Sequence, residues 1–408
     1  MHRSFLKSHP VSVIFQWLNG VCRRTVLCFA VVVGCNPVFA AVAARATNAT
    51  VLIATYTQGT SRGIYRATFS NQTGALSSPS LAAALPNPSW FVVNAAQTRL
   101  FAVSEMGSQA NEPVAFISSF RMNPAGRLSL ITRVNDLGDE PTHLALSRDE
   151  RYLFVSNYAL NDAPGGMLNT IPVDATGKLE PITQAFSFVG SHADPERQLS
   201  SHIHSAVLSP EGNFVFVCDL GADRVYTYRL RHDDRHQRPL QRIETNLPQL
   251  PPGAGPRHLV FSPDGKHAYL TYEMLGQVVV LDYNDGTLTP RQSIRLAPAE
   301  IEGRNSAAAI HVSADGRFVY ATNRGTYNQL VTLRVQPQTN QLELIQRVPV
   351  HGIEPREFAL SPDGHFVLIA NQKSNEIVTL RRDPASGLIG EVVSRLALSM
   401  PSQIVFIH

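Results

Sequence analysis

The side chains in this sequence that are best suited to chemistry are histidines, arginines and glutamates at the ends of short apolar runs. His202 and His204 precede one such run, and Glu273 directly follows another. Imidazole and carboxylate groups are the usual general acids and bases of enzymes. Guanidinium groups bind anions and developing oxyanions, and the arginines at matching positions are Arg257, Arg324 and Arg356. The residue types therefore predict acid–base chemistry beside an anion-binding surface.

The pair His202-x-His204 has a second interpretation, as two ligands of a metal ion. Alternate residues of a strand face the same way, so one ion could contact both rings. No cysteine or carboxylate cluster completes such a site at a predictable spacing, so we expect no metal and no cofactor. The sequence also has no Gly-x-Ser-x-Gly motif and no glycine-rich phosphate loop.

The elements that must position these residues recur along the chain. Seven apolar runs of strand length are spaced by about 50 residues, a period typical of propellers: 51–56, 100–105, 152–157, 214–219, 268–273, 318–323 and 367–372. Turns such as Ser209-Pro210-Glu211-Gly212 precede many of them, and further strands follow each one. The pattern predicts an all-β, seven-bladed β-propeller with four-stranded antiparallel blades. A β-sandwich gives no reason for the same turn to repeat at this spacing.

The two ends of the repeat predict how the ring closes. Residues 401–407 match the first-strand opening at 88–93, whereas residues 51–56 match a second strand. We therefore expect the C-terminal strand to join the N-terminal blade and to form its inner strand. No linker interrupts the repeat, so residues 50–408 are predicted to be one domain.

In a propeller, the start of the first strand and the end of the second strand share one face, so these positions converge on one mouth. The first-strand positions are Ser89, Thr142, His204, Arg257, Ala308, Arg356 and Ser402, with the neighbours Trp90, His143, Ser205, His258, Ala309, Glu357 and Gln403. The second-strand ends are Glu105, Asn157, Tyr158, Asp219, Glu273, Asn323, Arg324, Asn371 and Gln372. We expect substrate contacts from Glu105, His143, Asn157, His258, Arg356 and Gln372. Asn323, Asn371 and Asp219 are interpreted as polar groups that satisfy the backbone at strand ends.

Charge separates the N-terminus from the rest. The chain has a formal charge of +3, but four of its basic residues lie in the first 40 positions, which contain no acid. The remainder is close to neutral, which argues against a nucleic-acid-binding body.

The first 40 residues resemble an export leader. Arg23-Arg24 precede a short apolar run and then small residues, as in a secretory signal. Cleavage after Ala40 would leave residues 41–49 as a short linker. Alternatively, Val32-Val33-Gly34-Cys35 resembles a lipobox, which would leave a lipid on Cys35. A third interpretation is an extension without a targeting role. We favour export to the periplasm or medium; lipid on Cys35 is the less favoured outcome, and it would be the only attachment to a membrane.

Several motifs together resemble one family along nearly all of residues 50–408. They include Pro195-Glu196-Arg197-Gln198 before His202-Ile203-His204, Gly255-Pro256-Arg257-His258, Asn323-Arg324-Gly325 and Ala370-Asn371-Gln372. These residues resemble the seven-bladed lactonase family, which includes the propeller type of 6-phosphogluconolactonase and carboxy-muconate cycloisomerase. The resemblance implies lactone opening without a metal.

Carried over by position, the resemblance implies the catalytic residues His202, His204, Arg257, Glu273 and Arg324, and adds Arg197 to the substrate contacts. Glu273 or a histidine would activate water, and Arg257 and Arg324 would stabilise the oxyanion. Three positions depart from the family pattern: Ala309 where relatives often have Glu, Tyr272 where they often have Asn, and Ile203 where Pro or Ala is usual.

The expected function is therefore hydrolysis of a sugar or organic-acid lactone, with a small-molecule lactone as the partner and a monomeric protein. Two alternatives stay open: a non-catalytic propeller that binds an exported ligand or protein, and a muconate-type cycloisomerase. An exported protein would not meet a cytosolic phosphosugar, which argues against phosphogluconolactone as its substrate.

Overall fold

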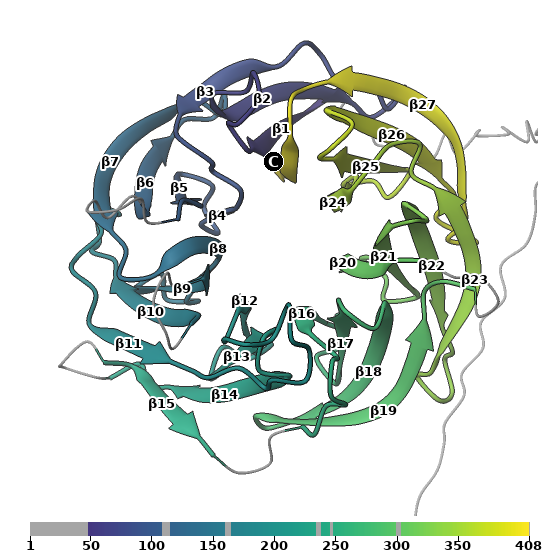
Figure 1. The fold of residues 1–408 in the computed structure, drawn as a ribbon. Coiled ribbons are helices and arrows are strands. Elements are labelled where there is room, and N and C mark those ends of the chain that lie inside the picture. Colours follow the sequence, from purple (N-terminus) through teal and green to yellow (C-terminus); the bar gives the residue numbers. More distant parts are fainter. Residues whose placement is uncertain are drawn as a thin grey trace, which may run out of the picture. The chain divides into compact units, whose positions relative to one another are not determined.

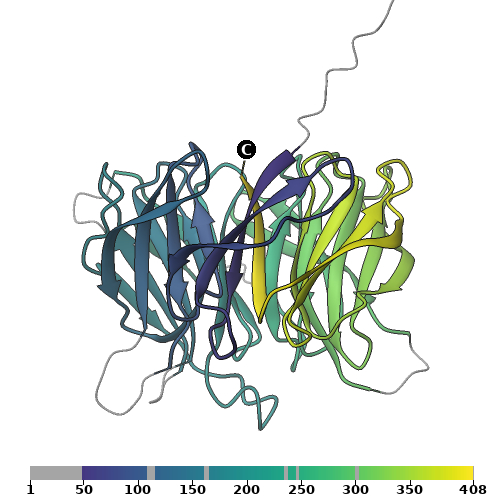
Figure 2. The same cartoon turned by 90° about the horizontal axis from the view of Figure 1, so that it is seen from above.

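The computed structural model describes residues 48–107, 115–159, 165–233, 238–244, 248–298 and 303–407. Within them, seven separate four-stranded antiparallel sheets stand around a central channel like the blades of a propeller (Figures 1 and 2). The predicted fold class is confirmed. The predicted leader and residues 41–47 of the predicted linker lie outside the described residues, and the first strand begins at Asn48, within the last two residues of that linker.

We number the blades 1 to 7 along the chain and give each from the channel outward. Blade 1 is β28 (Pro401–Ile407), β1 (Asn48–Thr55), β2 (Gly63–Ser70) and β3 (Ser80–Ala84); blade 2 is β4 (Phe91–Val93), β5 (Arg99–Ser104), β6 (Phe116–Met122) and β7 (Leu128–Asn135); blade 3 is β8 (Asp139–Leu146), β9 (Tyr152–Ala159), β10 (Met167–Pro172) and β11 (Gln184–Ser187). Blade 4 is β12 (Ile203–Leu208), β13 (Phe214–Asp219), β14 (Arg224–Leu230) and β15 (Leu240–Ile243); blade 5 is β16 (Pro256–Phe261), β17 (His267–Tyr272), β18 (Gln277–Asn284) and β19 (Thr287–Arg295). Blade 6 is β20 (Asn305–Val312), β21 (Phe318–Gly325), β22 (Gln329–Val335) and β23 (Leu342–Pro349); blade 7 is β24 (Pro355–Leu360), β25 (Phe366–Asn371), β26 (Glu376–Arg382) and β27 (Ile389–Ala397).

The repeated serine turn joins the first two strands of a blade at the end away from the mouth. In blade 6, the Ser313 hydroxyl donates to Asp315 at 2.6 Å and accepts the Phe318 backbone N–H at 3.0 Å. Gly316 then takes φ +73°, a left-handed conformation that glycine adopts without steric cost. The serine, the aspartate and the glycine therefore each have a fixed task in the turn, which is why the motif recurs.

The hydrophobic core is divided into layers between blades. Seven clusters of buried side chains each combine residues of two neighbouring blades, and one of them joins blade 7 to blade 1. Both faces of a blade are therefore covered, so β13 and β25 are buried along their whole length. This explains why the second strands are continuous apolar runs in the sequence rather than alternating ones.

The C-terminal strand closes the ring as predicted. β28 pairs antiparallel with β1, from Thr50 opposite Ile407 to Thr55 opposite Pro401. Gln403 adds a link to blade 2, because its amide accepts the Phe91 N–H at 2.9 Å and donates to the Phe91 carbonyl at 3.2 Å. Among the described residues there is no helix with the length and apolarity needed to cross a bilayer.

Candidate functional site at the mouth of the channel

The innermost strands carry a break in their pairing where they reach the mouth. In six blades of the described structure, one or two residues of the inner strand have no partner in the second strand. The skipped residues are Thr142, His204, Arg257, His258, Ala308, Ala309, Arg356 and Ser402. A β-bulge turns a side chain away from the regular alternation, so these breaks re-aim the inner-strand residues at the place where the predicted ring lies.

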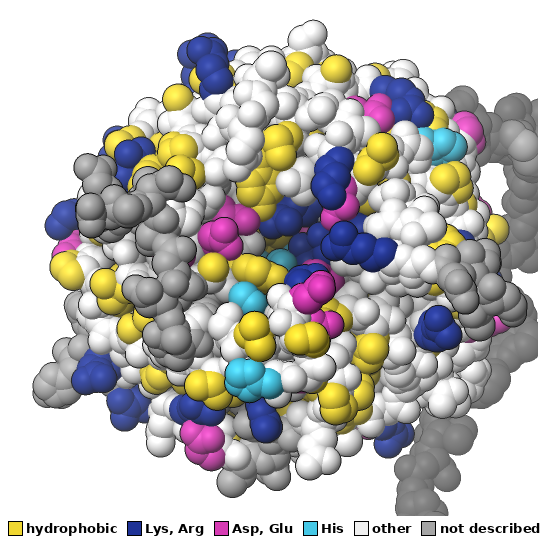
Figure 3. All heavy atoms as spheres, in the orientation of Figure 1, with side chains coloured by type: hydrophobic (Ala, Val, Ile, Leu, Met, Phe, Trp, Pro, Cys, Tyr) yellow, Lys and Arg dark blue, Asp and Glu magenta, His cyan; other side chains and the backbone are white. Residues whose placement is uncertain are grey.

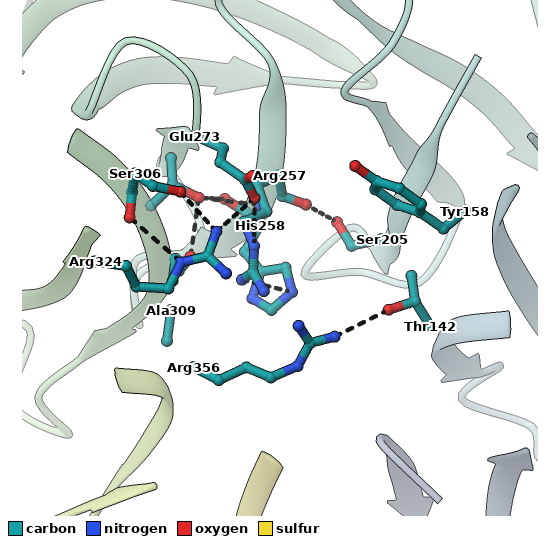
Figure 4. A network of polar contacts seen from close by, with 12 residues as sticks. Thr142, Tyr158, Ser205, Arg257, His258, Glu273, Ser306, Ala309, Arg324 and Arg356 are labelled. Carbon is teal, nitrogen blue, oxygen red and sulfur yellow. Dashed lines mark hydrogen bonds and ion pairs between the residues drawn. The ribbon is translucent and has the colours of Figure 1, made fainter. Parts of the chain in front are cut away.

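Glu273, which follows β17, is the centre of the site. Its Oε2 lies 3.0 Å from Arg257 Nε and 2.9 Å from Arg324 Nη2 (Figure 4). Its Oε1 lies 2.9 Å from Arg197 Nη2. Burial alone would raise the pKa of Glu273, but Arg324, Arg257 and Arg197 together lower that pKa to about 2. Glu273 is therefore a permanent carboxylate that holds three guanidinium groups in place, and a weak base at neutral pH.

Arg257 is the deepest of these arginines and is 1% exposed. Its contact with Glu273 is an ion pair rather than a well-aligned hydrogen bond, and its Nη1 lies 3.3 Å from His258 Nε2. Burial and the neighbouring Arg324 lower the pKa of Arg257 to about 9, which leaves it charged at neutral pH.

Below the arginines, aromatic and imidazole rings fill the channel. Trp90 stacks on His143 at 4.5 Å between ring centroids, and His258 meets His204 edge-on at 5.1 Å. Burial and Arg257 lower the pKa of His143 to about 3 and hold the pKa values of His204 and His258 well below the usual range. All three imidazoles are therefore neutral at pH 7, and His204 Nδ1 is buried with no hydrogen-bond partner among the described residues.

A second carboxylate lies on the opposite side of the mouth. Both oxygens of Glu105 accept the Tyr56 hydroxyl, at 2.7 and 2.8 Å, and Arg356 Nη2 lies 3.6 Å from Glu105 Oε2. The Thr142 hydroxyl donates to the same Oε2 at 3.3 Å. Arg356 also lies over the Tyr56 ring, 5.0 Å from its centroid, and is directed toward Thr142 in Figure 4. Glu105 therefore positions Arg356 on this side of the mouth as Glu273 positions its three arginines.

These groups surround an open cavity of about 390 Å³ at the mouth. In Figure 3 the central opening is ringed by dark-blue and magenta side chains, with cyan histidine inside it. The cavity is lined by Glu105, Glu140, Thr142, Tyr158, Arg197, His204, Glu273, Arg304, Arg324 and Arg356. A hollow of this size accepts a small polar molecule, and its lining combines fixed cations, fixed carboxylates and a neutral imidazole.

The structure brings most of the predicted site residues together. Six of them line the cavity: Glu105, Arg197, His204, Glu273, Arg324 and Arg356. Arg257, His143 and His258 lie directly beneath it in the channel, joined to its lining by the ion pair and ring contacts above.

Three predicted residues lie apart from the cavity. His202 stacks on Tyr158 at 4.5 Å and its Nδ1 contacts the Tyr158 carbonyl at 2.7 Å, so it supports a lining residue. Asn157 is fully buried and donates to the Met167 carbonyl within blade 3. Gln372 lines a different hollow, between blades 7 and 1. Their predicted roles in substrate contact or catalysis find no geometric support here.

Asp219 and Ala309 have explanations of their own. Asp219 accepts the Ser201 hydroxyl at 2.6 Å and the backbone N–H groups of His202 and Ala222 at 2.8 and 3.0 Å, so it braces the turn beside β12. The Ala309 side chain packs in the apolar layer between blades 6 and 7. The channel nevertheless holds a carboxylate, because Glu357 lies 3.8 Å from His258 Nδ1 and 2.6 Å from His311 Nε2.

Two lining residues, Glu140 and Arg304, were missed by the sequence reasoning. A signal for Glu140 exists: in five blades a proline lies within three residues of the start of the inner strand, and the residue before that proline has positive φ, at Asn87, Glu140, Gly255, Glu354 and Met400. Residues before proline normally favour extended conformations, so this repeated kink is specific to the mouth. The repeat of X-Pro could have added position X to the predicted ring. Among the described residues, no group of three or more His, Cys, Asp or Glu side chains is placed to hold a metal.

A family model described as "Lactonase, 7-bladed beta-propeller" matches residues 50–406 of this chain. Among curated proteins, the chain is 30% identical to a 6-phosphogluconolactonase of Bacillus subtilis, over 87% of this chain and 97% of that protein. It is 31% identical to a 6-phosphogluconolactonase of Formosa agariphila, over 84% of this chain and 94% of that protein.

Among solved structures, the chain is similar to a periplasmic gluconolactonase of Pseudomonas aeruginosa. The sequence identity is 43%, the TM-score is 0.85, and the match covers 88% of this chain and 99% of that one. A structure from Bacteroides uniformis described as a putative 6-phosphogluconolactonase has 33% identity and a TM-score of 0.79, with 88% and 100% coverage.

Proposed function

Because the chain belongs to the lactonase family of seven-bladed β-propellers, we propose that its mouth cavity hydrolyses the ester bond of a sugar or organic-acid lactone. One observation carries the proposal: Arg197, Arg257 and Arg324 converge on the ionised Glu273 beside the neutral imidazole of His204. Fixed positive charge next to a neutral base is the arrangement that ester hydrolysis requires.

In the proposed mechanism, the lactone carbonyl oxygen faces Arg324 and Arg197, and Arg257 adds charge from beneath. A ring nitrogen of His204 takes a proton from water, and the hydroxide attacks the carbonyl carbon. The arginines stabilise the oxyanion that forms. The ring C–O bond then breaks, and the imidazolium returns its proton to the ring oxygen, which gives the hydroxy acid. We assign the base to His204 because a ring nitrogen of His204 has no hydrogen-bond partner among the described residues and the residue lines the cavity, whereas both oxygens of Glu273 are occupied by guanidinium groups.

The test is hydrolysis of D-glucono-1,5-lactone by the purified protein, followed by acid release at constant pH. The uncatalysed opening of the lactone is subtracted. We expect Arg324→Lys to lower kcat/KM by about 100-fold, because a point charge replaces the fork that binds both the oxyanion and Glu273. Arg395→Lys, on the outer strand of blade 7, is the matched control and should leave turnover unchanged.

Two results would count against this proposal. Equal turnover by Arg324→Lys and the wild type would place the reaction elsewhere. Absence of turnover of any lactone, with a sugar acid still bound at the mouth, would favour the non-catalytic binding protein instead.

We further propose that the protein is exported and acts as a monomer on a small-molecule lactone. The basic flank and apolar run before residue 40 support export, and a similar protein in Pseudomonas aeruginosa is described as periplasmic. Cell fractionation tests the location. The mass of the mature protein distinguishes cleavage after Ala40 from a lipid on Cys35, and light scattering measures the oligomeric state.

A further inference from the structure

We propose that Glu140 selects uncharged, hydroxyl-rich lactones over phosphorylated or otherwise anionic ones, by placing an unpaired carboxylate where the far end of the substrate lies. This inference rests on the proposed function and concerns the substrate class of the same cavity.

Charge is divided around the mouth by blade. The carboxylates of Glu105 and Glu140 come from blades 2 and 3. The arginines around Glu273 come from the loop before blade 4 and from blades 5 and 6. In a seven-membered ring, blades 2 and 3 lie across the channel from blades 5 and 6 (Figure 1). A lactone whose carbonyl faces the arginines therefore directs its other end toward the acidic side.

Besides its acidic residues, the cavity has a second feature that indicates a binding site for a small molecule. His204 is only 5% exposed, lines the same hollow and has a ring nitrogen without a hydrogen-bond partner among the described residues. A buried polar atom without a partner at the wall of a cavity indicates a position at which a small molecule can form a hydrogen bond. The acidic side of the mouth therefore faces the part of the cavity in which we place the substrate.

Glu140 differs from the other carboxylates of the mouth in having no side-chain ion pair or hydrogen bond to any described residue. Glu354 occupies the equivalent position before Pro355 in blade 7, and it is paired with Arg324 at 3.2 Å and Lys373 at 3.3 Å. The charged groups that act on Glu140 are Glu105, Asp139 and Arg356; partial burial and the two acids raise its pKa. No described residue therefore occupies its oxygens, and we infer that they accept hydrogen bonds from substrate hydroxyls.

The cations of the cavity are mostly committed. Arg197 and Arg324 are bound to Glu273, and Arg356 lies beside Glu105. Of the four arginines that line the cavity, only Arg304, exposed at the rim, has no carboxylate partner within the described residues. A phosphate dianion at the far end of a sugar lactone would thus meet Glu140 and Glu105 with few unpaired cations to balance it. Like charges brought together in a partly desolvated site oppose binding, whereas hydroxyl groups donate readily to carboxylates.

The experiment compares D-glucono-1,5-lactone with its 6-phosphate, which has the same ring and a dianionic end. We expect the wild type to favour the uncharged lactone by about tenfold or more in kcat/KM. Glu140→Gln keeps the shape and removes the charge, and it should reduce this preference by about fivefold, mainly through a lower KM for the phosphate. Glu391→Gln, on the outer strand of blade 7, should leave the preference unchanged. In the wild type, about 0.5 M salt should also reduce the preference, because salt screens the repulsion.

The outcomes separate the two proposals. If neither lactone is hydrolysed, the proposed function fails. If both are hydrolysed and the wild type shows no preference, or prefers the phosphate, the inference about Glu140 fails alone. The inference also fails if the preference is the same in Glu140→Gln, or if Arg304→Gln selectively abolishes turnover of the phosphate, which would make the rim a phosphate site. Thermal unfolding shows whether each variant is folded, and the salt series on the wild type tests the inference without any variant.

Discussion

At the scale of single residues, the site depends on how Glu273 and its arginines share charge. Three guanidinium groups each lie about 3 Å from the carboxylate of Glu273, and without that carboxylate between them they would repel one another strongly. The same contacts hold Glu273 ionised. In the mechanism that we propose, Glu273 therefore acts through the arginines, as a positioning residue. His204, by contrast, faces the cavity as a neutral imidazole.

The substitution Glu273→Gln tests this division of roles. We expect kcat/KM for a lactone to fall at least about 100-fold, because the arginines lose their anchor. The free energy of unfolding should also fall, by about 3–5 kcal/mol, since buried cations lose their partner. The dependence of the residual rate on pH should keep its wild-type shape. A changed acid limb in Glu273→Gln would show instead that Glu273 is the base, and Glu391→Gln serves as the control.

At the scale of elements, the inner strands and the turns beside them set the direction of the site residues. The break between Ile203 and Ser205 turns His204 out of the β12–β13 ladder. Asp219 at the end of β13 then fixes the backbone just before β12, by accepting the His202 N–H and the Ser201 hydroxyl. Burial raises the pKa of Asp219 to about 6, although those donors oppose the increase. Burying the Asp219 carboxylate costs stability, and the carboxylate in turn fixes the backbone that leads into β12 and His204.

Replacing Asp219 with alanine should therefore weaken the fold and move His204. Its loss leaves the N–H groups of His202 and Ala222 and the Ser201 hydroxyl without their acceptor. We expect a decrease of about 2–4 kcal/mol in the free energy of unfolding, measured by urea denaturation. Asp233→Ala, at an exposed position, is the control. A variant as stable as the wild type would mean that other groups or water satisfy this turn.

At the scale of the whole molecule, the closed ring buries titratable groups in its channel. His143, His204 and His258 are neutral in the folded protein because burial and Arg257 lower their pKa values. In the unfolded chain they take up protons below about pH 6.5. The unfolded state then binds more protons, so these histidines reduce stability as the pH falls. Asp136 and Asp219 act in the opposite direction between about pH 6 and 4, because burial raises both pKa values to about 6.

We expect the free energy of unfolding to fall between pH 7 and pH 5, because three histidines outweigh two aspartates. Each histidine contributes up to about 1.4 kcal/mol per pH unit. Urea denaturation at several pH values measures the slope, and His143→Gln should make it shallower by the contribution of one proton. Stability that is constant or increases toward pH 5 would contradict the neutral channel histidines.

How far the sequence predicts the site differs from residue to residue. Glu273 and Arg324 follow or end second strands and His204 begins a first strand, so the repeat alone placed them at one mouth. Gln372 has a comparable position in the sequence, yet its side chain lies between blades. The ladder position of a residue specifies its height in the blade, whereas bulges and loop conformations decide the direction of its side chain.

The amino-acid sequence by itself determined the seven-bladed ring, its closure by the C-terminal strand and the height of most site residues, though not of Glu140 and Arg304. Local patterns suffice for these features, because each blade repeats the same turn chemistry and the same apolar runs. Only the tertiary structure showed that Glu273 is bound by three arginines, that the channel histidines are neutral, and that Glu140 has no ion pair with a described residue whereas Glu354 has two. Charge and protonation depend on which groups meet across the channel, and residues from blades far apart in the sequence meet only when the ring is closed.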